Sequence, residues 1–328
     1  MIQNAITTAV KFAVMLAIGL SILAVLILCA GRTWYWVSGV SQTQGIAGTV
    51  QVWNWPATLS GPGGYSGLAL QENGTVLRAA SDHGFLMEAQ IVRDETSRLV
   101  TLNAPKFSQV LSDQAKTLTG WLSDLEGLTP LPNGDLGLAY EGIPRIMRLS
   151  QPPDHGERIP TPLHKPDRFK AHTGNSSFEA IATLPSGDLL AILEGKPSPR
   201  QAHAYLYSDG EWQGPHFIPA RPNWDITGAD IGPDGCLYLV ERQYGVLTGF
   251  QTQLVRLRGR LAPPFELTQE VIWRGAPLRF GNGEGLSIWS NAAGKDTATI
   301  ITDDGFPPAP LGHPTQLIEL PLKKAPAC

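Results

Sequence analysis

The sequence predicts an all-β fold, a β-propeller with five marked blades and room for a sixth, after an N-terminal hydrophobic signal or anchor helix. Three observations predict it. A hairpin pattern recurs five times, glycine and proline are abundant (35 and 27 of 328 residues), and charged residues make up only 16%. Short strands joined by tight turns have this composition, and helical bundles do not. The 42% of hydrophobic residues are enough for a folded core.

Residues 1–39 are assigned to a signal peptide or membrane anchor. The segment 12–31 carries no charge and lies between Lys11 and Arg32. Twenty apolar residues can cross a bilayer as a helix, and the aromatic residues 34–36 follow where interfacial aromatics lie. Whether the segment is a cleaved signal peptide or a retained anchor, the rest of the chain is exported from the cytoplasm. We therefore expect the rest of the chain to be periplasmic or secreted, anchored to the inner membrane by 12–31 if the segment is retained.

Within residues 45–328, five stretches align, and each has a small residue at one fixed point: Gly67, Gly127, Ala180, Gly228 and Gly285. In the first four, a turn dipeptide such as Asn133-Gly134 ends seven residues later. Such dipeptides between alternating apolar runs predict two-residue hairpin turns with both residues at positive φ. About four strands per 50–60 residues, repeated in this way, are typical of a propeller. A sixth blade could be built from residues 40–60 and the C-terminal strand 316–320.

The predicted hairpin register places acidic residues opposite each other. In a two-residue hairpin, the numbers of opposed residues sum to a constant, which predicts three pairs: Glu126 with Glu141, Glu179 with Glu194, and Glu284 with Asp303. The same calculation sets Asp82 opposite Tyr65 and Glu241 opposite Gly228. Because the blades of a propeller point equivalent hairpin ends to the same face, we expect these acids to converge at one mouth of the central channel.

Clustered carboxylates need protons, basic partners or a hard cation. Calcium suits such a site because it takes six to eight oxygen ligands with flexible geometry. We therefore expect a calcium site whose ligands come from nine acidic residues: Asp82, Glu126, Glu141, Glu179, Glu194, Glu241, Glu284, Asp303 and Asp304. The alternative is that the acids accept hydrogen bonds from neighbouring blades and hold the blades together.

Four basic or titratable residues lie beside these acids. His83 sits at an acidic hairpin end and is a candidate general acid or base. Arg242 follows Glu241 and is the second candidate catalytic residue. Arg145 and Lys196 are candidates for binding the anionic oxygens of a substrate. The alternatives are a structural hydrogen bond for His83 and charge compensation of the acids for the basic residues.

Several other classes of protein are excluded or disfavoured. The chain has no run of five basic residues, so we expect no nucleic-acid partner. It has no CxxC or Cys/His cluster, no P-loop, no dinucleotide fingerprint and no G-x-S-x-G elbow. Cys236 and Cys328 can form a disulfide in an oxidising compartment, although spacing alone does not show that they meet.

The marked stretches also resemble a known family. They include DLEGLTPLPNGDLGLAYE (124–141), FEAIATLPSGDLLAILEG (178–195) and GEGL (283–286) followed by ITDD (301–304). In this order they resemble the phytase-like domain of bacterial secreted proteins described as having esterase-like activity of phytase, over residues 60–322. The resemblance implies a propeller and an extracytoplasmic hydrolase related in fold to calcium-dependent propeller phytases. Family members often have arginine where this chain has His83.

Two functional classes follow from the sequence. The first is a calcium-assisted hydrolase of small-molecule phosphate or carboxylic esters, monomeric, with its site at the acidic mouth and a membrane contact through the N-terminal segment if that is uncleaved. The second is a non-catalytic propeller whose mouth binds a ligand or a partner protein. The residues leave the substrate open.

Overall fold

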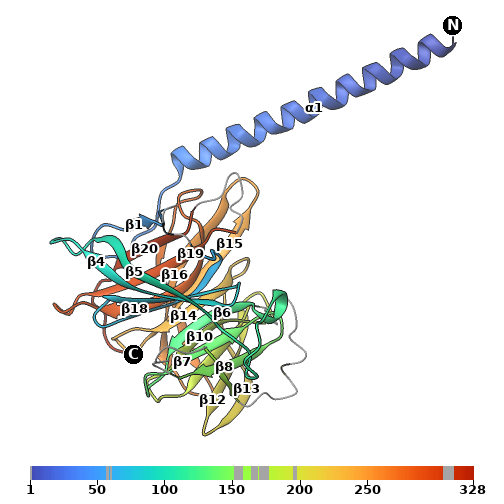
Figure 1. Cartoon of the computed structure of the whole chain (residues 1–328). Helices are drawn as coiled ribbons and strands as arrows, with labels where there is room; N and C mark the ends of the chain where they lie inside the picture. Colours follow the sequence, from blue (N-terminus) through green and yellow to red (C-terminus); the bar gives the residue numbers. More distant parts are fainter. Residues whose placement is uncertain are drawn as a thin grey trace.

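A computed structural model describes most of the chain: residues 2–56, 59, 61–150, 158–163, 169, 177–194, 198–305 and 314–328. Helix α1 (Ile2–Ser38) projects away from a body built of strands (Figure 1). The most apolar 18-residue window within its residues 11–38 has a mean hydropathy of 2.9, and none of that window is buried against the protein. The expected N-terminal apolar helix is thus confirmed, and it is long enough to cross a membrane.

The described strands form five four-stranded antiparallel sheets. Four of these blades use consecutive strands. The first blade contains β2 (Tyr65–Gln71), β3 (Val76–Ser81), β4 (Phe85–Arg93) and β5 (Leu99–Gln109). After the 3-10 turn η1 (Gly120–Leu122), the second contains β6 (Leu125–Pro130), β7 (Leu136–Tyr140), β8 (Arg145–Leu149) and β9 (Thr161–Pro162). The third contains β10 (Phe178–Thr183), β11 (Leu189–Leu193), β12 (Gln201–Ser208) and β13 (Glu211–Pro219). The fourth contains β14 (Asp225–Ile231), β15 (Leu237–Gly245), β16 (Gly249–Arg260) and β17 (Glu266–Arg274).

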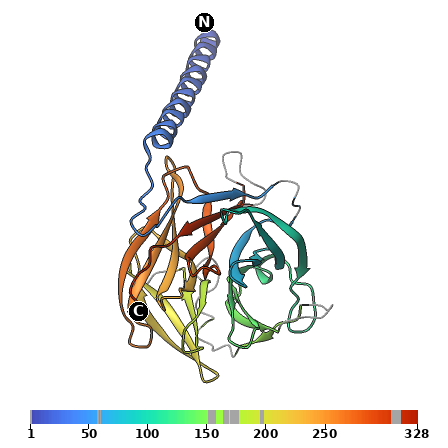
Figure 2. The same cartoon turned by 90° about the vertical axis from the view of Figure 1, so that its left-hand side faces the viewer.

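The fifth blade closes the ring with both ends of the propeller domain. It contains β18 (Asn282–Ser290), β19 (Asp296–Asp303), β20 (Gln316–Pro321) and β1 (Gln51–Asn54). β1 pairs antiparallel with β20, so the blue start of the propeller lies beside its red end (Figure 2). The terminal segments therefore do pair, as expected, but they complete the fifth blade and form no sixth. Pairing removes two sheet edges that would otherwise be exposed.

Apolar side chains between neighbouring blades form the core. Each of the five core clusters contains buried residues from two adjacent blades, such as Leu86 of the first with Leu138 of the second. The repeated small residue lies where two inner strands approach most closely. A Cβ atom at Gly67 would lie 2.8 Å from the Cβ of Leu128, and one at Gly228 would lie 2.2 Å from the carbonyl oxygen of Glu284. The small residue recurs at this position because the inner strands pack closely around the channel.

The hairpin turns differ from the predicted two-residue form. In the second blade the Leu131 N–H donates to the Asp135 carbonyl at 2.8 Å, which leaves a three-residue loop. Only its glycine, Gly134, has positive φ (+86°), whereas Asn133 does not. A type I turn followed by a left-handed glycine explains both facts. The register of this hairpin is consequently one residue away from the predicted one.

A β-bulge at the same position in every inner strand changes the register again. Each bulge adds one residue directly before the repeated small residue: Ser66, Glu126, Glu179, Thr227 and Glu284. The predicted opposed pairs are therefore wrong. The observed partners at these ends are Leu125 with Tyr140, Phe178 with Leu193, Asn282 with Asp303, Tyr65 with Ser81, and Ile226 with Glu241. A bulge bends its strand and changes the direction of one side chain, and four of these five residues, Ser66, Glu126, Glu179 and Thr227, line the channel.

The C-terminus is attached to the fourth blade. Cys236 and Cys328 form a disulfide with a Cα–Cα distance of 5.1 Å, across 92 residues of sequence. The third cysteine, Cys29, is free and exposed on α1.

Candidate functional site

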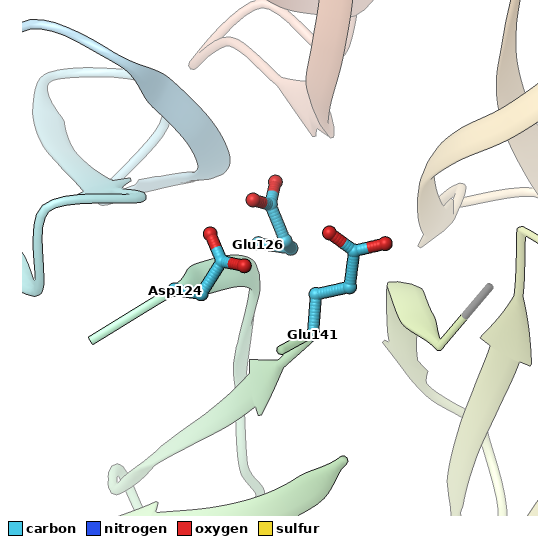
Figure 3. A group of neighbouring side chains, drawn as sticks. All are labelled: Asp124, Glu126 and Glu141. Atoms are coloured by element: carbon cyan, nitrogen blue, oxygen red, sulfur yellow. The ribbon is translucent and has the colours of Figure 1, made fainter. Parts of the chain in front are cut away.

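Five carboxylates from two blades meet at one mouth of the channel. They form two groups that share Glu141, and in each group one ligand atom per residue lies within 4.8 Å of the others. Asp124, Glu126 and Glu141 form the first group, with their carboxylates gathered in one region (Figure 3). Glu141, Glu179 and Glu194 form the second. We call these five residues the carboxylate cluster.

Equivalent positions in the two blades produce the cluster. Glu126 and Glu179 are the bulge residues of the inner strands β6 and β10. Glu141 and Glu194 each follow the second strand of their blade directly, after β7 and β11. The predicted convergence of these four glutamates therefore occurs, but through bulges rather than through opposed positions in a ladder.

Arg242 extends the site to the fourth and fifth blades. Its Nη2 donates to Oε1 of Glu194 at 3.1 Å, and its Nη1 donates to Oδ1 of Asn282 at 3.0 Å. The same Nη1 forms an ion pair with Glu284, whose Oε1 also accepts a hydrogen bond of 2.6 Å from Nδ2 of Asn282. One guanidinium thus connects acids from two blades that are not adjacent in sequence.

Burial raises the pKa values of these acids. It raises the pKa of Glu141 to about 7, and the neighbouring carboxylates of Asp124 and Glu194 add to the effect. Burial also raises the pKa of Glu284 to about 8, although Arg242 acts in the opposite direction. The pKa values of Glu126 and Glu179 lie well above the ordinary value, again through burial first and neighbouring acids second. Near neutral pH the site therefore binds protons or requires a cation.

A second acidic group lies on the rim. Nδ1 of His83 lies 2.8 Å from Oδ1 of Asp82, and the His83 side chain is 42% exposed. Burial raises the pKa of Asp82 to about 6, while His83 lowers it and Asp303, Asp124 and Asp304 raise it. Oδ1 of Asp304 accepts a hydrogen bond of 3.2 Å from the Gly64 N–H. The rim thus contains the predicted Asp82, His83, Asp303 and Asp304.

The donor atoms of the cluster fit a hard cation. All five residues offer carboxylate oxygens, which calcium prefers over nitrogen or sulfur. In the cluster, Oε1 of Glu141 is buried and accepts no hydrogen bond from the described residues, and the same holds for Oε2 of Glu284 beside Arg242. Buried carboxylate oxygens without a partner are costly, and a cation in contact with them would remove that cost.

Two predicted residues form mainly local contacts in the described structure. Glu241 is fully buried, accepts a hydrogen bond from Gln253 and lies 3.8 Å from Nε of Arg221. Arg145 stacks over the Tyr140 ring at 3.7 Å, and its guanidinium donates to the Ile143 and Leu122 carbonyls. The Glu241 side chain thus lies in the interior rather than at the mouth. The Arg145 guanidinium is held by these local contacts, and its charge opposes the rise in the pKa of Asp124 that burial causes. Lys196 lies outside the described residues.

Two site residues were missed by the sequence reasoning. Asp124 lies two positions before Glu126, and side chains two apart on an extended chain share a face, so this spacing could have identified it. Asn282 similarly lies two positions before Glu284 and contacts both Glu284 and Arg242. Neither residue belongs to a predicted acidic pair, which explains the omission.

Comparison with known proteins identifies a family. The phytase-like family profile, described as esterase-like activity of phytase, matches residues 60–306. No curated protein matches the chain. A streptogramin B lyase structure is 16% identical, with 84% of this chain and 74% of that chain covered and a TM-score of 0.39. A luciferin-regenerating enzyme is 11% identical, with 85% and 99% covered and a TM-score of 0.45. At these values, the structural similarities assign neither a substrate nor a reaction.

Proposed function

The chain belongs to the phytase-like family described as esterase-like activity of phytase, and from this premise we propose that it is an extracytoplasmic, cation-assisted hydrolase of phosphate or carboxylic esters. The observation that carries the proposal is the carboxylate cluster. Five acids from two blades converge at one mouth, and the buried Oε1 of Glu141 accepts no hydrogen bond from the described residues. A role in blade packing alone would not require this arrangement.

The five cluster residues would hold the cation, with calcium as the expected ion. When bound, the cation would supply Lewis-acid polarisation of an ester oxygen and neutralise negative charge. Arg242 fixes the positions of Glu194 and Glu284, so the two ends of the site keep a constant separation. Its role is positioning, because its two terminal nitrogens already have protein partners.

His83 is the candidate for proton transfer. Its Nδ1 lies 2.8 Å from Oδ1 of Asp82, so this carboxylate would stabilise the ring once the ring has accepted a proton. The ring would accept a proton from an attacking water and return one to the leaving group. Its partial exposure on the rim is compatible with contact to a substrate bound above the cluster.

The test is an assay of the purified chain on p-nitrophenyl phosphate, p-nitrophenyl acetate and phytate, with calcium and with chelator. We expect turnover of at least one substrate, loss of turnover in chelator, and a fall of at least tenfold for Glu126→Gln. Glu72→Gln is the matched control, because Glu72 is exposed on the β2–β3 turn at the far end of its blade. Chelator-insensitive turnover that survives Glu126→Gln would contradict the proposal.

A second candidate function is a non-catalytic module that binds a cation or ligand at the same mouth. The contacts of Arg242 favour this second function. Its guanidinium already binds Glu194, Asn282 and Glu284, so it is occupied by protein partners rather than open to a substrate anion. Calcium binding measured by calorimetry without turnover of any tested ester would support this function over the first.

A further inference from the structure

An exposed apolar tip extends from the fourth blade on the side of the acidic mouth. The β15–β16 hairpin turns between the paired Gly245 and Gly249. Tyr244 and Val246 are each 65% exposed, and Leu247 and Phe250 are also exposed. The rings of Tyr244 and Phe250 pack against each other at 5.0 Å. Four apolar side chains within seven residues at a hairpin tip mark a contact surface rather than a core.

The end of α1 lies against this tip. Nη1 of Arg32 donates to the Val246 carbonyl at 3.0 Å. Leu247 packs so closely on Gly31 that a Cβ there would lie 3.0 Å from its Cδ2 atom. The tip is therefore attached to the last turns of the helix.

The same end of α1 carries exposed aromatic residues. Trp34 is 70% exposed, and Trp36 is half exposed. Arg279 donates to the Trp36 carbonyl at 3.0 Å, and its guanidinium lies 4.3 Å from the Trp36 ring centroid. We call the tip residues 244–250, Trp34, Trp36 and Arg279 the hairpin–helix surface.

We infer that the hairpin–helix surface is a second membrane contact, seated in the headgroup region of a phospholipid bilayer. The helix itself indicates this occupant, because its large apolar side chains between Phe12 and Ile27 are exposed and suited to a bilayer. Its end would then lie at the interface, where tryptophan, tyrosine and arginine are favoured. A tip in contact with that end lies at the same depth.

The membrane contact would also position the acidic mouth. Arg242 lies on β15 only two residues before Tyr244, or roughly 7 Å of extended strand. A tip seated among headgroups therefore holds this side of the mouth close to the bilayer surface. The inference requires that α1 is retained, and it holds whether the mouth hydrolyses or only binds its ligand.

The test uses the full chain, α1 included, in phospholipid vesicles, with Cys29→Ser to remove the free thiol. A fluorophore is attached at Val246→Cys, and in a matched control at Ala293→Cys, an exposed position on the β18–β19 turn at the opposite end of a blade. We expect a headgroup-linked nitroxide lipid to quench the label at 246 at least twofold more than the label at 293. Equal quenching at the two positions, whether strong or weak, would overturn the inference. Unchanged melting temperatures of the two unlabelled variants confirm that both are folded.

Discussion

Replacing Glu141 by glutamine is expected to stabilise the cation-free protein at pH 8. Burial raises the pKa of Glu141 from an ordinary 4.5 to about 7, so the folded chain keeps this proton up to about pH 7 while the unfolded chain releases it near pH 4.5. The stabilisation from the bound proton is complete below pH 4.5, is lost as the pH rises through 7, and is absent at pH 8. At 1.36 kcal/mol for each tenfold change in proton affinity, the loss is about 3 kcal/mol.

Glutamine keeps the shape of the side chain and cannot ionise, so it avoids this loss. We expect Glu141→Gln to raise the melting temperature in chelator at pH 8 by roughly 6 °C, at about 2 °C per kcal/mol for a chain of this size. At pH 5 the two proteins should differ little, because Glu141 is then protonated in the folded state. The measurement is calorimetry at both pH values, with Glu72→Gln as the exposed control. An equal or lower melting temperature for the variant at pH 8 would refute the electrostatic reasoning.

Three further predictions concern the cation, the arginine and the disulfide. Calcium at a hundredfold excess over its dissociation constant should stabilise the protein by about 2.7 kcal/mol. The double variant Glu126→Gln, Glu179→Gln should lose most of this stabilisation, measured by calorimetry, and should still fold. Identical melting curves of the unchanged protein with and without chelator would exclude the metal site. Arg242→Met should lower the free energy of unfolding in urea by about 3–5 kcal/mol, because it leaves buried acids without the positive charge of the guanidinium. A decrease below about 1 kcal/mol would mean that these acids are already neutral. Cys328→Ser should cost about 4–5 kcal/mol for a loop of this length, measured by urea unfolding under non-reducing conditions, and a reductant should lower the stability only of the unchanged protein.

The repeated pattern in the sequence determined the architecture. Turn dipeptides and alternating apolar residues act locally, so they report hairpins wherever they occur. The apolar segment 12–31 likewise predicted a helix from composition alone, and the structure contains it. The number of blades was open at the sequence level because β1 and β20 are far apart in sequence. Their paired residues Asn54 and Gln316 are separated by 262 positions. Only their pairing decides that the terminal strands complete a fifth blade.

The acidic mouth was predictable for a different reason. Carboxylates at equivalent points of a repeated unit must converge when the units are arranged around an axis, and Glu126, Glu141, Glu179 and Glu194 do so. Their exact partners were not predictable, because one bulge per inner strand shifts the register by one residue and no local signal distinguishes a bulged strand from a regular one.

The tertiary structure alone decided which charges share the site. Glu241 and Arg242 are adjacent in sequence, yet successive side chains of a strand point to opposite faces. Arg242 consequently reaches Glu194 and Glu284 at the mouth, while Glu241 pairs with Gln253 in the interior. Sequence determines which residues repeat, whereas the direction of each side chain and its partners from other blades depend on how the blades pack around the axis.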